Sequence, residues 1–174
     1  MNTLIIYYSK SGMTKIVAQT LAKNIGADIL EIVDLKERNS ISSKLTASFD
    51  AFRENKTKIL PNNIDLTDYD VVYIGTPVWA GKPAPAITTI IDKLLLRGKD
   101  VILFSTMSSS GGDTTNERMA QKVKMRGGRT VESFTLKTKD KTTADIVKST
   151  EVLINSLDLN LYNNWFIWQI KNKN

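Results

Sequence analysis

The sequence predicts a doubly wound α/β domain, a three-layer sandwich in which a five-stranded parallel sheet lies between two layers of helices. Five short runs rich in β-branched and aromatic residues recur along the chain, and amphipathic helical patterns separate them. This alternation is typical of parallel sheets. Two of the runs are continuously apolar, as expected for strands buried on both faces. Because crossovers between parallel strands are right-handed, helices are expected on both faces of the sheet.

The five strands are expected at residues 3–8, 28–33, 70–75, 100–106 and 130–136. The first, TLIIYY, is a compact β-branched and aromatic run. The third and fourth, DVVYIG and DVILFST, are the continuously apolar ones. The second, DILEIV, and the fifth, TVESFTL, alternate between apolar and polar residues, and the fifth is expected at an edge of the sheet.

Helices are expected in the connections between strands. The first would place four residues on one face, namely Ile16, Val17, Thr20 and Leu21. The second follows the third strand; Pro83 and Pro85 suit its start, and Gly98 suits its end. Its apolar face would consist of Ile87, Ile90, Ile91, Leu94 and Leu95.

Two further helices are expected in the second half of the chain. The third would span residues 113–126, with Asp113 as its N-cap and Met119 and Val123 spaced along it. The fourth would span residues 143–157 and carry an apolar face that begins at Ile146.

Two segments fit this alternation less well. Residues 36–62 form a polar insertion, in which residues 43–54 could form a short helix. Residues 160–174 form an aromatic and basic tail whose spacing suits a short helix that packs on the domain or on a partner subunit. A contact with a membrane surface through Lys171 and Lys173 is the alternative. The expected domain therefore spans residues 1–159, insertion included, and a monomer or a homodimer is expected.

Composition excludes several classes of site. The chain has 174 residues, which suits one domain, and it contains neither cysteine nor histidine. Disulfides, iron–sulfur clusters, zinc sites built on thiolate or imidazole, and a Ser-His-Asp triad are therefore excluded. Any redox chemistry needs a cofactor. No transmembrane segment and no secretory signal are expected, and a cysteine-free chain suits the reducing cytoplasm.

The net charge of +6 is unevenly distributed, because residues 118–141 hold eight basic and two acidic residues. Such a face could meet an acidic protein, a nucleic acid or an anionic membrane. A solvated helix face and strand end explain it more simply. No aromatic residues interleave with these charges as they do on a base-stacking platform, so no specific nucleic acid is expected.

Three loops follow strands and should meet at the carboxyl edge of the sheet, where ligands bind in open α/β folds. The first loop, between the first strand and the first helix, consists of Ser9, Lys10, Ser11, Gly12, Met13 and Thr14. A helix start with a glycine and hydroxyl donors favours a phosphate group. The loop lacks the GK[ST] element and the GxGxxG pattern, which disfavours nucleoside triphosphates and dinucleotides. A capped turn without a ligand is the alternative interpretation.

The second loop follows the third strand and consists of Thr76, Pro77, Val78, Trp79, Ala80, Gly81, Lys82 and Pro83, of which the first six are the expected contacts to the ligand. Prolines and a glycine make it stiff, and the indole of Trp79 could stack on a flat ring. The alternative is that Trp79 packs on neighbouring elements.

The third loop follows the fourth strand and consists of Thr106, Met107, Ser108, Ser109, Ser110, Gly111, Gly112 and Asp113. Its small residues would let backbone amides approach the polar edge of a planar ring. A flexible linker is the alternative interpretation. Together the three loops describe a ligand with one terminal phosphate, a flat ring and a polar ring edge, which fits flavin mononucleotide (FMN).

At this point the sequence resembles the flavodoxin family. Ser9, Ser11, Gly12 and Thr14 match the family's phosphate-loop pattern [ST]-x-[ST]-G-x-T, and Trp79 matches its aromatic over the flavin. The resemblance covers residues 2–157 and implies strand order 2-1-3-4-5 with non-covalently bound FMN. The chain departs from the family in its basic charge, in the long insertion, and in a third loop without an aromatic, where Met107 could pack instead.

The resemblance implies an FMN-binding electron-transfer protein that works with redox partner proteins. The alternative is an FMN-dependent NAD(P)H:quinone-type oxidoreductase with an open pocket over the flavin. A phospho-receiver domain is disfavoured, because the ends of the first and third strands lack the carboxylates that such a domain needs. Asp65, Asp68 and Asp70 precede the third strand and so lie at the edge of the sheet opposite the three loops. They are expected to act as turn and cap residues.

Overall fold

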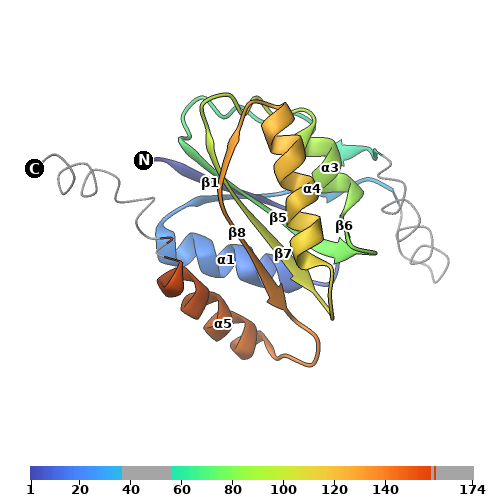
Figure 1. Ribbon diagram of the computed structural model, residues 1–174, viewed down its shortest axis with the longest axis vertical. Helices are drawn as coiled ribbons and strands as arrows, with labels where there is room; N and C mark the ends of the chain where they lie inside the picture. The colour runs from blue at the N-terminus through green and yellow to red at the C-terminus, as the bar shows by residue number, and fades with distance from the viewer. Residues whose placement is uncertain (37–55, 158, 160–174) are drawn as a thin grey trace, which may run out of the picture.

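The computed structural model describes residues 1–36, 56–157 and 159 of the chain (Figure 1). Five strands run parallel in the order β2-β1-β5-β7-β8, which confirms the expected order and the edge position of the last strand. Their bounds are β1 Thr3–Tyr7, β2 Asp28–Glu31, β5 Val71–Trp79, β7 Asp100–Met107 and β8 Arg129–Lys137.

Three short strands lie outside this parallel order. The second expected strand stops at Glu31, and the chain continues as β3, Val33–Asp34, which pairs antiparallel with β4, Ile59–Leu60. The strand β6, Lys82–Pro83, folds back antiparallel onto the end of β5. Both departures are short ribbons at the carboxyl side of the sheet, where the chain leaves the core.

Helices cover both faces of the sheet (Figure 1). Helices α1, Met13–Ile25, and α5, Thr143–Ser156, lie on one face, and α3, Pro85–Ile91, and α4, Gly112–Met125, lie on the other. Alternate residues of β1 divide between the two cores, because Ile5 packs with the α1–α5 side and Ile6 with the α3–α4 side. The predicted three-layer sandwich is therefore present. Among the described residues, no helix is long and apolar enough to cross a membrane.

A close contact between two central strands depends on Gly75 of β5. A Cβ atom at this position would lie 2.1 Å from Cζ of Phe104, whose ring fills the space above the glycine. The Phe104 ring in turn stacks on Phe134 of β8, with centroids 5.6 Å apart and planes 10° apart. Three neighbouring strands are thus packed together through one pair of rings.

Two expected helix boundaries are wrong. The helix after the third strand ends at Ile91, and Gly98 instead forms a turn before β7 with a φ of 76°. In the connection between them Leu94 and Leu96 are buried, whereas Leu95 is 76% exposed and does not belong to the apolar face. Because α3 ends before these residues, helical spacing does not decide which of these three leucines is buried. The course of the turn decides it.

Asp113 is not the N-cap of α4. Gly111 occupies that position with a left-handed φ of 91°, and Asp113 lies exposed in the first turn, where its charge favours the helix dipole. The helix begins earlier because the chain passes very close to the β5–β6 hairpin. A Cβ atom at Gly111 would lie 3.0 Å from the Cα atom of Gly81.

The insertion is described only at its ends. Thr57 ties its last part to the fold: its hydroxyl donates to Oδ1 of Asp34 at 2.7 Å, and its amide donates to the hydroxyl of Thr89 at 3.0 Å. The short helix expected at 43–54 and the tail 160–174 lie outside the described residues. The domain boundary at residue 159 stays a prediction.

Candidate functional site

The three loops lie at the carboxyl edge of three neighbouring strands, β1, β5 and β7. From β1 the chain first moves to β2 on one side and later returns to β5 on the other. The strand order therefore reverses between β1 and β5, which is the topological switch point where open α/β sheets bind ligands.

Each pair of these loops is joined by a contact. The first and third loops meet through the buried hydroxyls of Thr14 and Thr106, whose Oγ1 atoms are 2.8 Å apart. The second and third meet at the close approach of Gly81 and Gly111 described above. The ring of Trp79 in the second loop lies edge-to-face against Tyr8, the residue before the first loop, at 5.7 Å between centroids. The structure thus assembles the three loops into one site.

The first loop leads into α1 through Gly12, which has a left-handed φ of 89° and offers no side-chain cap. The hydroxyl of Ser9 accepts the amide of Lys15 at 3.2 Å, so this serine does cap the first turn. The amides of Met13 and Thr14 lie at the helix start, where the helix itself supplies no acceptor. The loop therefore combines a serine cap with amides oriented to receive an anion.

Sequence reasoning missed a polar cluster beneath this loop. The Glu31 carboxylate, at the end of β2, accepts from the Lys15 ammonium at 2.9 Å and from the Tyr7 hydroxyl at 3.0 Å, in both cases through Oε2. Burial, and then the hydrogen bond and negative charge of Glu31, raise the pKa of Tyr7 well above its ordinary value. Lys15 is thereby drawn toward β2. The detectable signal was a carboxylate ending an alternating strand at the ligand-binding edge.

The second loop proves to be a β-hairpin. The chain extends to Trp79, turns at Ala80 and Gly81 with φ values of 49° and 71°, and returns as β6. Two consecutive positive φ values are typical of a tight hairpin turn that follows the twist of the strands. The buried hydroxyl of Thr76 accepts the amide of Ala84 at 2.9 Å and closes the base of the hairpin. Pro77 and Val78 lie in the extended strand, half-buried.

Trp79 itself is half-buried at the tip of β5. It packs against the core on the α3–α4 side as well as against Tyr8. The alternative interpretation, that this tryptophan packs on its neighbours, therefore describes part of its environment. Its contact with a flat ring stays a prediction.

The third loop contains one exposed part and one tightly packed part. Ser108, Ser109 and Ser110 are exposed, whereas a Cβ atom at Gly112 would lie 2.5 Å from Thr135 and 3.0 Å from the sulfur of Met107. Close packing thus requires glycine at positions 111 and 112, and the flexible-linker interpretation is wrong for this half of the loop.

In the first loop, Lys10 and Ser11 are exposed.

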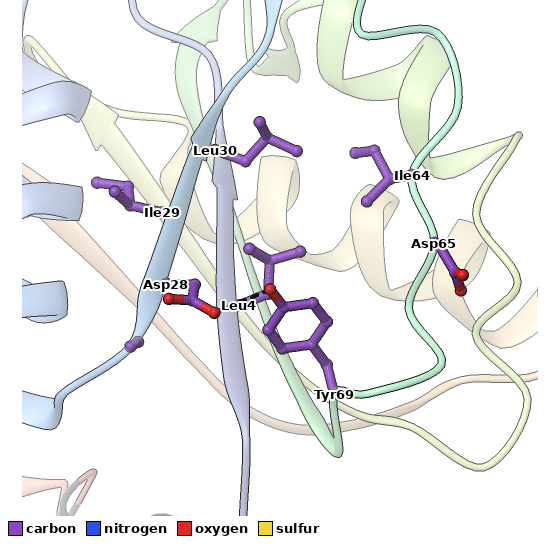
Figure 2. Close-up of a pocket in the computed structure, with 8 residues that line it drawn as sticks. Leu4, Asp28, Ile29, Leu30, Ile64, Asp65 and Tyr69 are labelled. Carbon is purple, nitrogen blue, oxygen red and sulfur yellow. Dashed lines mark hydrogen bonds between the residues drawn. The ribbon is translucent and has the colours of Figure 1, made fainter.

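A separate hollow of about 470 Å³ lies at the opposite, amino edge of the sheet (Figure 2). Leu4, Leu30 and Ile64 line it, and the hydroxyl of Tyr69 donates to the Asp28 carboxylate at 2.9 Å. Asp65 forms a turn, accepting from both the amide and the hydroxyl of Thr67, which agrees with the expected turn role. The hollow shares no residue with the three loops.

The flavodoxin family model matches residues 2–149 of the chain. A flavoprotein from Lactobacillus acidophilus, solved in complex with FMN, is 28% identical over 77% of this chain and 92% of its own, with a TM-score of 0.67. No curated protein matches closely enough to count as a relative.

More distant structures share the fold. A candidate flavoprotein from Bacteroides uniformis has a TM-score of 0.72 at 22% identity, covering 86% of this chain and 97% of its own. Oxidised flavodoxin 1 from Bacillus cereus has a TM-score of 0.54 at 18% identity, covering 89% and 98% respectively.

Proposed function

Because this chain belongs to the flavodoxin family, we propose that it carries electrons between redox proteins on a bound FMN. The expected cofactor is confirmed by the family together with the FMN complex of the 28% identical flavoprotein. FMN takes up and releases electrons reversibly, chemistry that the chain's own side chains cannot supply. The observation that supports the assignment most strongly is the meeting of three loops at one switch point.

The backbone of the site fits a phosphate and a planar ring. An added Cβ atom at Gly12 or Gly81 meets nothing within 4 Å, so both residues border open space and leave the backbone accessible to a ligand. The amides of Met13 and Thr14, with the hydroxyl of Ser11, would bind the phosphate.

The remaining loops would hold the ring. Trp79 would cover one face, and the small residues from Ser108 to Gly111 would bring backbone amides to its polar edge. Gly81 would leave room for a backbone group to change its hydrogen bond with the redox state. In this scheme the chain binds and orients the flavin and contributes no acid or base. We place this activity in the cytoplasm, which suits a cysteine-free redox protein.

Spectroscopy of the purified protein tests the cofactor. A yellow protein, or a colourless one whose tryptophan fluorescence is quenched by added FMN, is expected. A colourless protein that ignores FMN would refute the proposal. Gly12→Ala should weaken binding of FMN more than of riboflavin, because it disturbs the phosphate contact alone. Gly98→Ala is the matched control, since Gly98 also has a positive φ and open surroundings but lies outside the three loops.

Stopped-flow mixing of the oxidised holoprotein with NADPH tests the carrier role. A carrier should keep its flavin absorbance over seconds and lose it only when a reductase is added. Rapid bleaching by NADPH alone would contradict the carrier and indicate the quinone-reductase type of enzyme.

A further inference from the structure

The basic run at residues 118–141 is divided by the fold between two opposite edges of the sheet. Lys122 and Arg129 lie toward the amino edge and pair with Asp92 at 3.3 Å and Asp100 at 2.8 Å. Lys137, the last residue of β8, and Lys139 and Lys141, which follow it, lie at the carboxyl edge, beside the proposed flavin site. The sequence alone shows one basic segment, whereas the structure shows two separate groups with different partners.

The second group borders the third loop directly. Lys137 lies opposite Met107 in the β7–β8 pairing, and the next residue, Thr138, donates its amide to the Met107 carbonyl at 2.9 Å. Lys137 and Lys139 are exposed, while the Lys141 ammonium donates to the hydroxyl of Ser149 at 3.3 Å. The chain thus places two exposed ammonium groups next to the loop expected to hold the ring edge.

Other lysines lie along the same carboxyl edge of the sheet, and together with Lys137 and Lys139 they form what we call the basic rim. Lys82 lies opposite Trp79 across the hairpin, and Lys10 lies in the first loop. Lys15 and Glu31 form a pair and cancel. Among the described residues around the carboxyl ends of β1, β5, β7 and β8, five other lysines lie with three acidic residues: Lys10, Lys82, Lys137, Lys139 and Lys141 against Asp113, Asp140 and Asp145.

The opposite edge differs in sign near β1 and β5. Asp65, Asp68 and Asp70 all precede β5, and Asp28 begins β2. Of these, Asp28 and Asp65 line the hollow seen in Figure 2. Charge of one sign beside a redox site steers a partner of the other sign and orients it at encounter. A basic rim would repel a partner with a basic docking face.

We propose that the carboxyl edge is the docking surface for an acidic redox protein, one that carries an excess of carboxylates around its own redox centre. This inference rests on the proposed function. Electrons would pass between the two cofactors across this surface. This polarity agrees with the basic charge by which the chain departs from the family, and it follows from where the fold places Lys137 and Lys139.

Two small electron acceptors of opposite charge test the local potential. The holoprotein, reduced with dithionite and freed of excess reagent, is mixed with hexacyanoferrate(III) or with hexaammineruthenium(III). Each acceptor ion takes one electron, so one fully reduced flavin consumes two ions and releases its protons to water. Raising the ionic strength from about 0.01 M to about 0.3 M, which screens exposed charges, should slow the anionic acceptor and speed the cationic one. The opposite salt dependence would overturn the proposal.

Charge reversal locates the effect. The pair Lys137→Glu with Lys139→Glu should slow the anionic acceptor about tenfold at low salt, and the difference should vanish at high salt. The control pair, Lys93→Glu with Lys124→Glu, reverses two exposed lysines toward the amino edge. Each replacement removes two units of charge, so both double variants change the net charge from +6 to +2. Equal slowing by the two pairs would overturn the proposal, because net charge alone would then explain the rates.

Protein acceptors test the class of partner. An acidic b-type cytochrome should be reduced faster than a basic c-type cytochrome at low salt, and the carboxyl-edge pair should remove that preference. A milder pair, Lys137→Gln with Lys139→Gln, should give an intermediate effect. Sedimentation of the holoprotein with phosphatidylserine vesicles, together with no preference for the acidic cytochrome, would overturn the proposal in favour of a membrane surface. If the protein binds no FMN, the proposed function itself is refuted, and none of these rates can be measured.

Discussion

The hydroxyl pair of Thr14 and Thr106 allows a quantitative test of how the site is built. Their Oγ1 atoms are 2.8 Å apart, and the two side chains are 1% and 4% exposed. Valine replaces threonine with almost the same shape, so Thr14→Val leaves the Thr106 hydroxyl buried without this partner, and Thr106→Val does the same to Thr14. A buried hydroxyl that loses its partner costs about 1–3 kcal/mol.

The double variant removes both hydroxyls together and should be nearly as stable as the parent. Each single variant should lower Tm by about 2–4 °C for every kcal/mol lost in a domain of this size. The coupling energy of the pair is expected to be at least about 1 kcal/mol. It is measured by urea unfolding of the FMN-free proteins, since bound cofactor would add its own stabilisation.

The control is Thr150→Val in α5. Its hydroxyl is fully buried but donates to the Ile146 carbonyl, which lies in the same helix. Combined with Thr14→Val, it should give additive losses, because the two threonines share no hydrogen bond. Losses for Thr14→Val and Thr106→Val that also add, within about 0.5 kcal/mol, would refute the argument that this bond joins the first and third loops.

Three further predictions concern packing and charge. Gly75→Ala should lower Tm by several degrees, since its Cβ would lie 2.1 Å from the Phe104 ring, and Phe104→Leu should restore part of the loss. Glu31→Gln should lower the pKa of Tyr7 in an alkaline absorbance titration while leaving it above the ordinary value, because burial, the larger cause, remains; an unchanged titration would contradict this. At the start of α5, a hydrogen bond from the cap residue lowers the pKa of Asp145. The stability this contributes is present above the unfolded pKa and is lost as pH falls through the folded pKa, so Asp145→Asn should flatten the acid limb of stability against pH.

Much of the fold could be predicted because its signals are local. The apolar runs around Ile5, Tyr73 and Phe104 form central strands, and the alternating run at residues 130–136 forms an edge strand, as expected. The spacing of apolar residues that identifies a strand or a helix depends only on residues close together in the sequence. The boundaries failed where a tertiary contact intervened, as at Gly111, where the close approach of the hairpin replaced the expected aspartate cap.

The residues of the candidate site could also be predicted from the sequence, because glycine, serine and threonine at strand ends supply hydroxyl donors and accessible backbone amides. The hydrogen-bond partners of these residues could not be predicted in the same way. Thr14 lies 92 positions from Thr106, and Lys15 lies 16 positions from Glu31. No period or motif connects residues that far apart.

Local patterns therefore identify the five parallel strands, the helices that connect them, the three loops and the family they resemble, but not the short strands β3, β4 and β6. The contacts between the loops, the hairpin form of the second loop, and the position of Lys137 and Lys139 beside the third loop emerge only when the chain is folded. Contacts across a sheet depend on which strand ends lie side by side. That arrangement is set by packing all three layers together, and no single stretch of chain contains it.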